Sequence, residues 1–273
     1  MPRIALCQLT STPDPEANLA LVRAGVARAR AEEATVAVFP EATMAQFGTP
    51  LMPIAEPLDG PWASEVAAIA QRHDVLVVAG MFTPADDGRV HNTLLITGRG
   101  HHRGYDKIHL YDAFGFEESR TVAAGGEVVT VDVDGAKLGV ATCYDVRFPE
   151  LFQALADTGA YAVILPASWG AGEGKREQWE LLVRARALDS GSWVLACDQA
   201  DPAACGFEVD PKIPTGIGCS LVADPVGRVH AGLSTGPDTL VVDVDPDLAE
   251  RSRRATAVLA NRRLGHSAAT PPR

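Results

Sequence analysis

The sequence predicts a layered α/β domain built around mixed β-sheets, and three observations support that prediction. Short apolar runs alternate with segments of helical hydrophobic spacing from the first residues onward. Helices are followed directly by strands several times, which is typical of parallel α/β folds. Two further pairs of apolar runs are joined by turns too short for a helix, so their strands must pair antiparallel. These hairpins break the strict alternation of a (β/α)8 barrel, although the length of 273 residues would suit one.

The boundaries of the expected elements follow from the hydrophobic spacing. In the first helix, for example, Leu19, Val22 and Val26 recur on one face. We expect helices over residues 15–33, 62–73, 149–157, 175–188 and 246–254. We expect strands over residues 4–9, 35–39, 75–79, 101–105, 128–133, 137–142, 161–165, 193–197, 217–223, 228–231 and 240–244. The turns Asp134-Gly135 and Pro225-Val226-Gly227 close the two hairpins.

The composition excludes several classes of partner. With 35 acidic and 24 basic residues the net charge is −11, which repels the phosphates of nucleic acid. The longest apolar run, residues 75–82, is far shorter than the roughly 18 residues that a membrane-spanning helix needs. Five cysteines without paired spacing are typical of a reducing compartment, and the first residues favour a short strand over an export signal. We therefore expect a cytoplasmic protein that binds neither nucleic acid nor membranes.

One domain is expected over residues 1–263, followed by a tail over residues 264–273. Six arginines lie on the last expected helix and beyond it, namely Arg251, Arg253, Arg254, Arg262, Arg263 and Arg273. A solvated helix followed by a mobile tail explains them most simply, and a contact between subunits is the alternative.

Cys143 is the residue most indicative of chemistry. It follows the apolar strand over residues 137–142 and precedes a helix that begins near Pro149. A thiol there lies at the carboxyl end of a strand, where open α/β folds bind ligands. Amides at the following helix N-terminus would stabilise a thiolate, and a neighbouring backbone N–H could hold an oxyanion. The alternative is a buried, inert cysteine.

Glu41 and Lys107 occupy matching places in the chain. Glu41 follows the strand over residues 35–39, and Lys107 follows the strand over residues 101–105. A carboxylate, an ammonium and a thiol at three strand ends can converge on one pocket. Surface salt bridges remain the alternative for both residues, because spacing alone does not establish convergence.

Three segments resemble the signature segments of the nitrilase superfamily, the carbon-nitrogen hydrolases. They are Phe39-Pro40-Glu41, Tyr105-Asp106-Lys107-Ile108-His109-Leu110 and Cys143-Tyr144-Asp145-Val146-Arg147-Phe148-Pro149-Glu150-Leu151, in the family's order and at its usual separations. The resemblance implies an αββα four-layer sandwich with two mixed β-sheets, no cofactor or metal, and a homodimer or higher homo-oligomer. It also implies a catalytic triad of Glu41, Lys107 and Cys143.

The resemblance further implies a second glutamate in the pocket. It puts that glutamate at Glu118, with the adjacent Glu117 as the alternative. In the implied mechanism Glu41 is the general base, while the Lys107 ammonium and the backbone N–H of Tyr144 hold the oxyanion. Ammonia leaves, and water then cleaves a thioester on the cysteine to a carboxylic acid.

The segment that begins at Cys143 is more similar to omega-amidases and deaminated glutathione amidases than to true nitrilases. This branch implies a small amide substrate that also carries a carboxylate, such as an omega-amide of a 2-oxo acid or deaminated glutathione. Arg147 matches a position that contacts substrate carboxylate in related carbamoylases, and a structural salt bridge to Asp145 or Glu150 is its alternative. Trp169, at the end of a strand, is expected to line the pocket or to act as a capping aromatic.

Other functions remain as alternatives. Within the family these are hydrolysis of an N-carbamoyl amine or amino acid and a catalytically silent binding module. Without the resemblance, a Cys-His hydrolase that uses Cys143 and His109 would be the best enzyme alternative. The residues 170–175 lie where a phosphate-binding loop would, but the glycine spacing is one residue short and Arg176 replaces the Ser or Thr that would meet magnesium. HExxH and CxxC patterns are absent from the sequence, which argues against a zinc enzyme. The one GxSxG match, residues 232–236, lies between two expected strands rather than at the strand-to-helix turn of a nucleophile elbow, which argues against a serine hydrolase.

Overall fold

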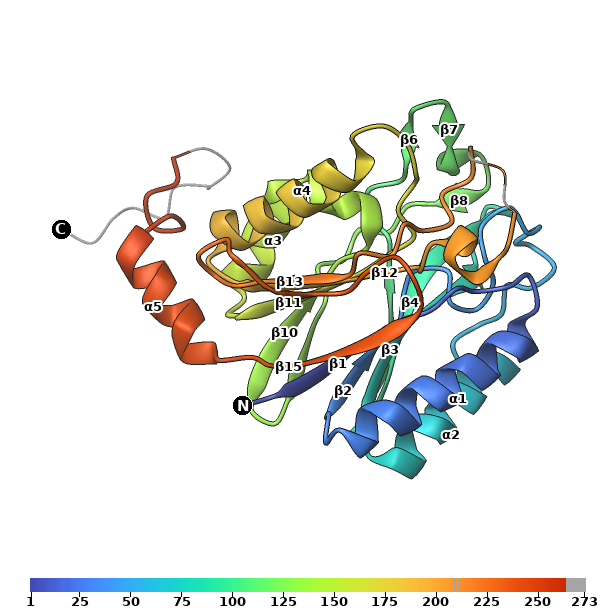
Figure 1. Ribbon diagram of the computed structural model, residues 1–273, viewed down its shortest axis with the longest axis horizontal. Coiled ribbons are helices and arrows are strands. Elements are labelled where there is room, and N and C mark those ends of the chain that lie inside the picture. The colour runs from blue at the N-terminus through green and yellow to red at the C-terminus, as the bar shows by residue number, and fades with distance from the viewer. Residues whose placement is uncertain (209, 211, 264–273) are drawn as a thin grey trace.

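The computed structural model describes residues 1–208, 210 and 212–263. Figure 1 shows a helical layer, two β-sheets and a second helical layer stacked on one another. The predicted αββα sandwich with two mixed sheets is therefore confirmed. The tail expected over residues 264–273 lies outside the described residues.

The first sheet has the strand order β15-β1-β2-β3-β4-β5, with β8 paired to β4. Its strands are β1 (Arg3–Gln8), β2 (Val36–Val38), β3 (Leu76–Pro84), β4 (Val90–Gly98), β5 (His101–Asp106), β8 (Val122–Ala123) and β15 (Asp238–Asp243). Strands β1, β2 and β3 run parallel, and antiparallel strands flank them on both sides. Helices α1 (Pro15–Ala31) and α2 (Pro61–His73) make the crossovers that parallel strands require.

The second sheet repeats this plan with the order β14-β13-β12-β11-β10-β9. Its strands are β9 (Thr130–Val133), β10 (Ala136–Val140), β11 (Ala162–Ala167), β12 (Trp193–Asp198), β13 (Leu221–Ala223) and β14 (Val229–Gly232). Strands β10, β11 and β12 are parallel, with α3 (Pro149–Asp157) and α4 (Lys175–Ser190) as crossovers. The remaining pairs are antiparallel, including the two predicted hairpins.

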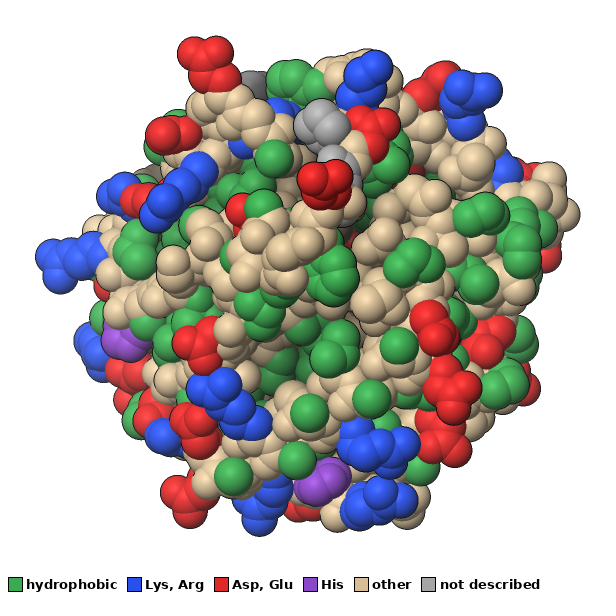
Figure 2. All heavy atoms as spheres, turned by 45° about the vertical axis from the view of Figure 1, so that its right-hand side comes forward, with side chains coloured by type: hydrophobic (Ala, Val, Ile, Leu, Met, Phe, Trp, Pro, Cys, Tyr) green, Lys and Arg blue, Asp and Glu red, His purple; other side chains and the backbone are tan. Residues whose placement is uncertain are grey.

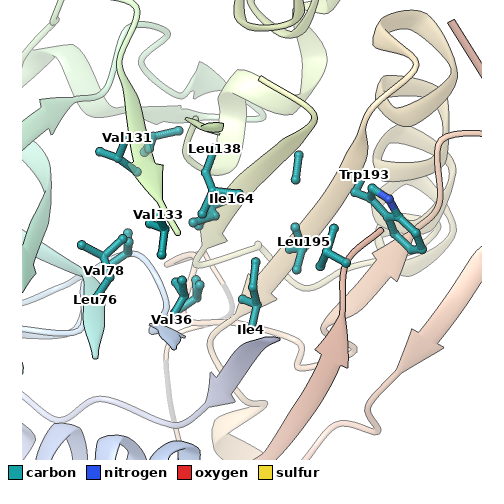
Figure 3. Packing of buried hydrophobic residues seen from close by; sticks show 14 of the residues in the cluster. Ile4, Val36, Leu76, Val78, Val131, Val133, Leu138, Ile164, Trp193 and Leu195 are labelled. Atoms are coloured by element: carbon teal, nitrogen blue, oxygen red, sulfur yellow. The ribbon is translucent and has the colours of Figure 1, made fainter. Parts of the chain in front are cut away.

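Three apolar layers hold the sandwich together. The central layer lies between the sheets, where Ile4 and Val78 of the first face Leu138 and Leu195 of the second (Figure 3). The outer two layers lie between each sheet and its own pair of helices. Because the parallel strands are covered on both faces, they consist of nearly continuous apolar runs. Each fully buried aliphatic side chain contributes about 1.5–3 kcal/mol by leaving water.

The structure differs from the predicted elements at several strands; β8 was not expected, and β13 covers only Leu221–Ala223 of the strand expected over residues 217–223. Two further differences are larger. The strand expected over residues 75–79 runs on to Pro84 as β3 and pairs along its whole length with β4, which was not expected. A small hairpin of β6 (Asp112–Ala113) and β7 (Phe116–Glu117) was also missed, and it projects from the sandwich in Figure 1. Both differences bear on the site, because β4 and this hairpin each contribute a side chain to it.

The arginine-rich end is not uniformly solvated. Helix α5 (Pro246–Thr256) forms as expected, but Arg253 donates hydrogen bonds to the carbonyls of Ala160 and Ser190 and to the hydroxyl of Ser192. Burial lowers the pKa of Arg253. This arginine therefore ties α5 to the ends of the second sheet and α4.

In the described part of the chain, none of the helices is long and apolar enough to cross a bilayer. On the face shown in Figure 2, acidic and basic side chains are interspersed around the rim, while neutral and hydrophobic atoms fill most of the centre. That face therefore presents no continuous basic surface of the kind that binds phosphate backbones.

Candidate active site

A cavity with about 360 Å³ of empty space opens where the carboxyl ends of strands from both sheets meet. All seven residues singled out from the sequence line it, namely Glu41, Lys107, Glu118, Cys143, Tyr144, Arg147 and Trp169. Residues that the sequence reasoning did not single out complete the lining, among them Phe47, Tyr111, Phe116, Ser168, Gly170, Lys175 and Pro214. The pocket therefore collects residues from segments more than 170 positions apart in the chain.

Two carboxylates and one ammonium form a buried cluster at the inner end of this cavity. Lys107 Nζ lies 2.9 Å from Glu41 Oε1 and 2.9 Å from Glu118 Oε2. All three side chains are at most 3% exposed, so the surface salt bridges considered for Glu41 and Lys107 are ruled out. Glu118 faces the cluster, whereas Glu117 is exposed and approaches Arg120 at 3.8 Å.

Asn92 on β4 orients both carboxylates. Its Nδ2 donates to Glu41 Oε1 at 2.8 Å and to Glu118 Oε1 at 2.9 Å. The backbone N–H of Ser168 donates to the other oxygen of Glu41 at 2.9 Å. Sequence reasoning missed Asn92, and the available signal was a single amide side chain in a strand that is buried along most of its length.

The charge state of Lys107 follows from these contacts. Burial alone would lower the pKa of Lys107, but the negative charges of Glu118 and Glu41 hold it well above its usual range. Lys107 is therefore a cation throughout the physiological pH range. Its Nζ donates a hydrogen bond to Glu41 and forms an ion pair with Glu118, so at least one of its three N–H donors remains for a further acceptor.

Cys143 lies on a strained turn. It begins the 3₁₀ turn η2 (Cys143–Arg147) directly after β10, and its φ of +46° is in the left-handed region that non-glycine residues seldom adopt. Asp145 fixes this turn by accepting hydrogen bonds from the Thr142 backbone N–H at 2.9 Å and the Tyr105 hydroxyl at 2.6 Å. The same carboxylate thus joins the turn to β5, the strand that leads to Lys107.

The expected stabilisation of a thiolate by the helix N-terminus is wrong. Burial raises the pKa of the Cys143 thiol well above its usual range, the Glu41 carboxylate raises it further, and Lys107 offsets only part of this. The helix that was expected to supply its amides, α3, begins only at Pro149, six residues later. The resting thiol is therefore protonated, and its Sγ approaches the carbonyl of Ser168 at 3.9 Å.

The outer part of the pocket combines two cations with aromatic rings. The Arg147 guanidinium lies 5.1 Å from the ring centre of Trp169 and 5.7 Å from those of Tyr144 and Phe114. Its Nη2 donates to Gln178 Oε1 at 2.9 Å. Arg147 forms no ion pair with Asp145 or Glu150 within the described residues, so the salt bridge considered as its alternative role is not formed. Trp169 lines the pocket, and its backbone N–H donates a hydrogen bond to Asp198 Oδ1 at 2.8 Å.

His109 does not take the place that a Cys-His hydrolase would require. Its Nδ1–H donates to Asp145 at 2.7 Å, and its ring stacks on Phe148 with the two centres 3.7 Å apart. His109 is not among the residues that line the cavity. In the part of the chain that the structure describes, His, Cys, Asp and Glu side chains nowhere gather as a group of three that could hold a metal ion.

Comparisons with known proteins identify the family of the chain. The family model for carbon-nitrogen hydrolases matches residues 3–254. A hydrolase of Mycobacterium tuberculosis is 52% identical over 265 residues, 95% of each chain. The deaminated glutathione amidase of Escherichia coli O157:H7 is 33% identical and covers 96% of this chain and 97% of its own.

A solved structure supports the same assignment. Nit3 of Saccharomyces cerevisiae, a member of branch 10 of the nitrilase superfamily, superposes with a TM-score of 0.80 at 28% identity over 93% of each chain. This protein belongs to the carbon-nitrogen hydrolase family, within the nitrilase superfamily.

Proposed function

We propose that the protein is a thiol-dependent amidase that cleaves a linear amide of a small, carboxylate-bearing substrate to ammonia and a carboxylic acid. The observation that carries the proposal is the protonated, buried Cys143 thiol beside the Glu41 carboxylate, which is itself held by Lys107. A thiol that is neutral at rest needs a base at the moment of attack, and a carboxylate in this setting supplies one.

The first half-reaction follows from the positions of these groups. As Cys143 Sγ attacks the amide carbon, Glu41 accepts the thiol proton. The third N–H of Lys107 and the backbone N–H of Tyr144 stabilise the negative charge on the carbonyl oxygen. Glu41 then protonates the amide nitrogen, the C–N bond breaks, and ammonia leaves an acyl thioester on the cysteine.

The second half-reaction returns the enzyme to its resting state. Water takes the place of ammonia, and Glu41 removes one of its protons as the oxygen attacks the thioester. The C–S bond breaks, the proton returns from Glu41 to the sulfur, and the carboxylic acid departs. Glu118 and Asn92 contribute by fixing Lys107 and Glu41 and are positioning residues in this scheme.

Arg147 supports the proposal that the substrate also carries a carboxylate. Its planar guanidinium faces the pocket and can bind a carboxylate through two parallel hydrogen bonds. Omega-amides of 2-oxo acids and deaminated glutathione both meet this requirement, and relatives with those names cover nearly the whole chain. We propose that the protein acts in the cytoplasm as a homodimer.

The test is a screen for released ammonia. The purified protein would be incubated with 2-oxoglutaramate, deaminated glutathione, an N-carbamoyl amino acid and a nitrile, with Cys143→Ala as the matched control. We expect ammonia from the two amides, little from the nitrile, and none from the variant. Preferred cleavage of the N-carbamoyl compound would replace the proposed substrate class, and silence on all four would favour a binding module.

A further inference from the structure

Two of the three cations that line the pocket have no acidic partner in the part of the chain that the structure describes. Lys107 is paired with Glu41 and Glu118. Arg147 and Lys175, by contrast, form no ion pair with any Asp or Glu among the residues that the structure describes. Most buried or half-buried charges are paired, so two unpaired cations in one pocket are unusual.

The hydrogen-bonding capacity of both side chains is largely unused. A guanidinium has five N–H donors, yet among the described residues Arg147 has one acceptor, the Gln178 side chain, and its buried Nε has no partner there. The ammonium of Lys175 has three donors, and its one hydrogen bond to a described residue is a long 3.5 Å approach to the Tyr111 hydroxyl. The remaining donors are available to a ligand.

The two cations also share the same aromatic surroundings. Lys175 Nζ lies 3.4 Å from the ring centre of Phe114 and 6.0 Å from that of Trp169, the two rings that Arg147 also approaches. Burial lowers the pKa of Lys175, and the positive charge of Arg147 lowers it further. The two positive charges therefore lie close enough to repel each other. An anion bound between them would relieve that repulsion.

The backbone fixes where Lys175 stands. It is the first residue of α4, preceded by Gly174 in the left-handed conformation, and its carbonyl accepts a hydrogen bond from the Trp169 indole at 3.0 Å. Gln178, one turn further along the same helix, holds Arg147. The start of α4 thus positions both cations, one directly and one through an amide.

We propose that Lys175 and Arg147 together bind a single carboxylate of the substrate, on the exposed side of the pocket relative to Cys143. This inference rests on the proposed function and names the substrate class more closely: half-amides of short dicarboxylic acids, with the amide at the thiol and the distal carboxylate between the two cations. Lys175 is then a specificity-determining residue of the site. Carboxylates bind well to such a pair because charge-assisted hydrogen bonds are stronger than neutral ones.

The first test measures binding without turnover. Glutarate, a dicarboxylate that lacks the amide, would be titrated calorimetrically into the wild type, Lys175→Gln, Arg147→Gln and the double variant. Each single change should raise the Kd about 10- to 100-fold, as expected for loss of a hydrogen bond to a charged group. Because both side chains bind the same carboxylate, the Kd of the double variant should rise by less than the product of the two single fold-changes.

Arg176→Gln is the matched control, since it removes the same charge from the same turn of α4 at an exposed position outside the cavity lining. Its Kd for glutarate should equal that of the wild type. Lys175→Arg should bind more tightly than Lys175→Gln, because it restores the charge. Wild-type affinity in Lys175→Gln, an equal loss in Arg176→Gln, or absence of glutarate binding to the wild type would each overturn the proposal.

A second readout separates this inference from the proposed function. The ratio of kcat/KM for glutaramate to that for neutral pentanamide should fall about tenfold or more in Lys175→Gln, mainly through KM. An unchanged ratio, with both amides still cleaved, would contradict only the role of Lys175. Lys175-dependent glutarate binding without ammonia release from any amide would contradict only the amidase proposal.

Discussion

The inner and outer ends of the pocket are built on opposite principles. At the inner end every charge has its partner: Glu41 and Glu118 flank Lys107, and Asn92 donates to both carboxylates. At the outer end Arg147 and Lys175 lie over aromatic rings with most of their donors unused. The charges of the inner end are therefore paired within the protein, whereas the outer end offers hydrogen-bond donors to a ligand.

This difference separates the chemistry of the site from its selectivity. A preorganised inner cluster does not have to rearrange when charge develops on the substrate. This lack of rearrangement is the main source of electrostatic stabilisation of the transition state. An incomplete outer end gains most from a ligand that supplies the missing charge. Substitutions at the two ends should consequently change different measured quantities.

The largest effect is expected for Glu41→Gln. Removal of a general base typically lowers the rate about 10²- to 10⁴-fold. At the same time the pKa of Cys143 should fall, because the carboxylate that helps to raise it is gone. The variant should thus form thiolate at lower pH while turning over far more slowly, which the pH dependence of iodoacetamide alkylation would reveal. Glu117→Gln, a nearby exposed glutamate, is the control, and near-normal turnover in Glu41→Gln would refute its role as base.

Lys107→Met should impair both activity and stability. Loss of one oxyanion donor costs about 10²- to 10³-fold in rate. Removing the one cation between two buried carboxylates should also lower the free energy of unfolding by about 3–5 kcal/mol, measured by urea denaturation. Because the folded-state pKa of Lys107 is raised, the stability it contributes is present across neutral pH and disappears only in strongly alkaline solution.

An exposed ion pair provides the comparison for Lys107. Arg103 pairs with Glu127 at 2.9 Å on the surface, and Arg103→Met should change the free energy of unfolding by only about 0–1 kcal/mol. Equal losses of stability in the two variants would contradict the distinction between a buried cluster and a surface pair.

Arg147→Lys should have a smaller and more selective effect. Lysine keeps the charge but cannot reproduce two parallel hydrogen bonds to a carboxylate. We expect the preference for a carboxylate-bearing amide over a neutral one, measured as the ratio of kcat/KM values, to fall about tenfold, or ~1.4 kcal/mol. Equal losses on both substrates would mean that this arginine is structural.

Chelators should not change the activity of the enzyme. The proposed chemistry uses only side chains and backbone amides, so activity should survive incubation with EDTA and should not depend on ATP. Steady-state ammonia release before and after dialysis against EDTA checks this. Loss of activity that zinc restores would show that a metal takes part.

The positions of the inner residues could be predicted from the sequence because these reactive side chains stand directly at the carboxyl ends of strands. Glu41 and Cys143 each follow a strand whose apolar pattern is easy to recognise, whereas Lys107 follows β5, whose residues are mostly polar. The carboxyl ends of strands are where α/β folds bind ligands. Glu118 could be chosen over Glu117 only through the family resemblance. In the structure one of the two faces Lys107 and the other faces solvent, a difference that local spacing does not encode.

The residues that were missed depend on contacts across the sandwich. Asn92 acts through Glu41 and Glu118, which lie 51 and 26 positions away in the sequence. Its own strand therefore contains no pattern that predicts these partners. The raised pKa of Cys143 likewise arises from burial between elements and from a carboxylate of the other sheet. Lys175 was considered only as part of a failed phosphate-binding pattern, and its proximity to Arg147 appears only once α4 is packed.

The most direct test of the account is the identity of the acylated residue. The wild type would be mixed with a slowly hydrolysed amide, quenched in acid within the first turnover, and analysed by intact-mass spectrometry and peptide mapping. The account predicts one acyl group, bound as a thioester to Cys143 and absent from Cys143→Ala. An adduct on Cys7, Cys197, Cys205 or Cys219, or full turnover without any adduct, would contradict it.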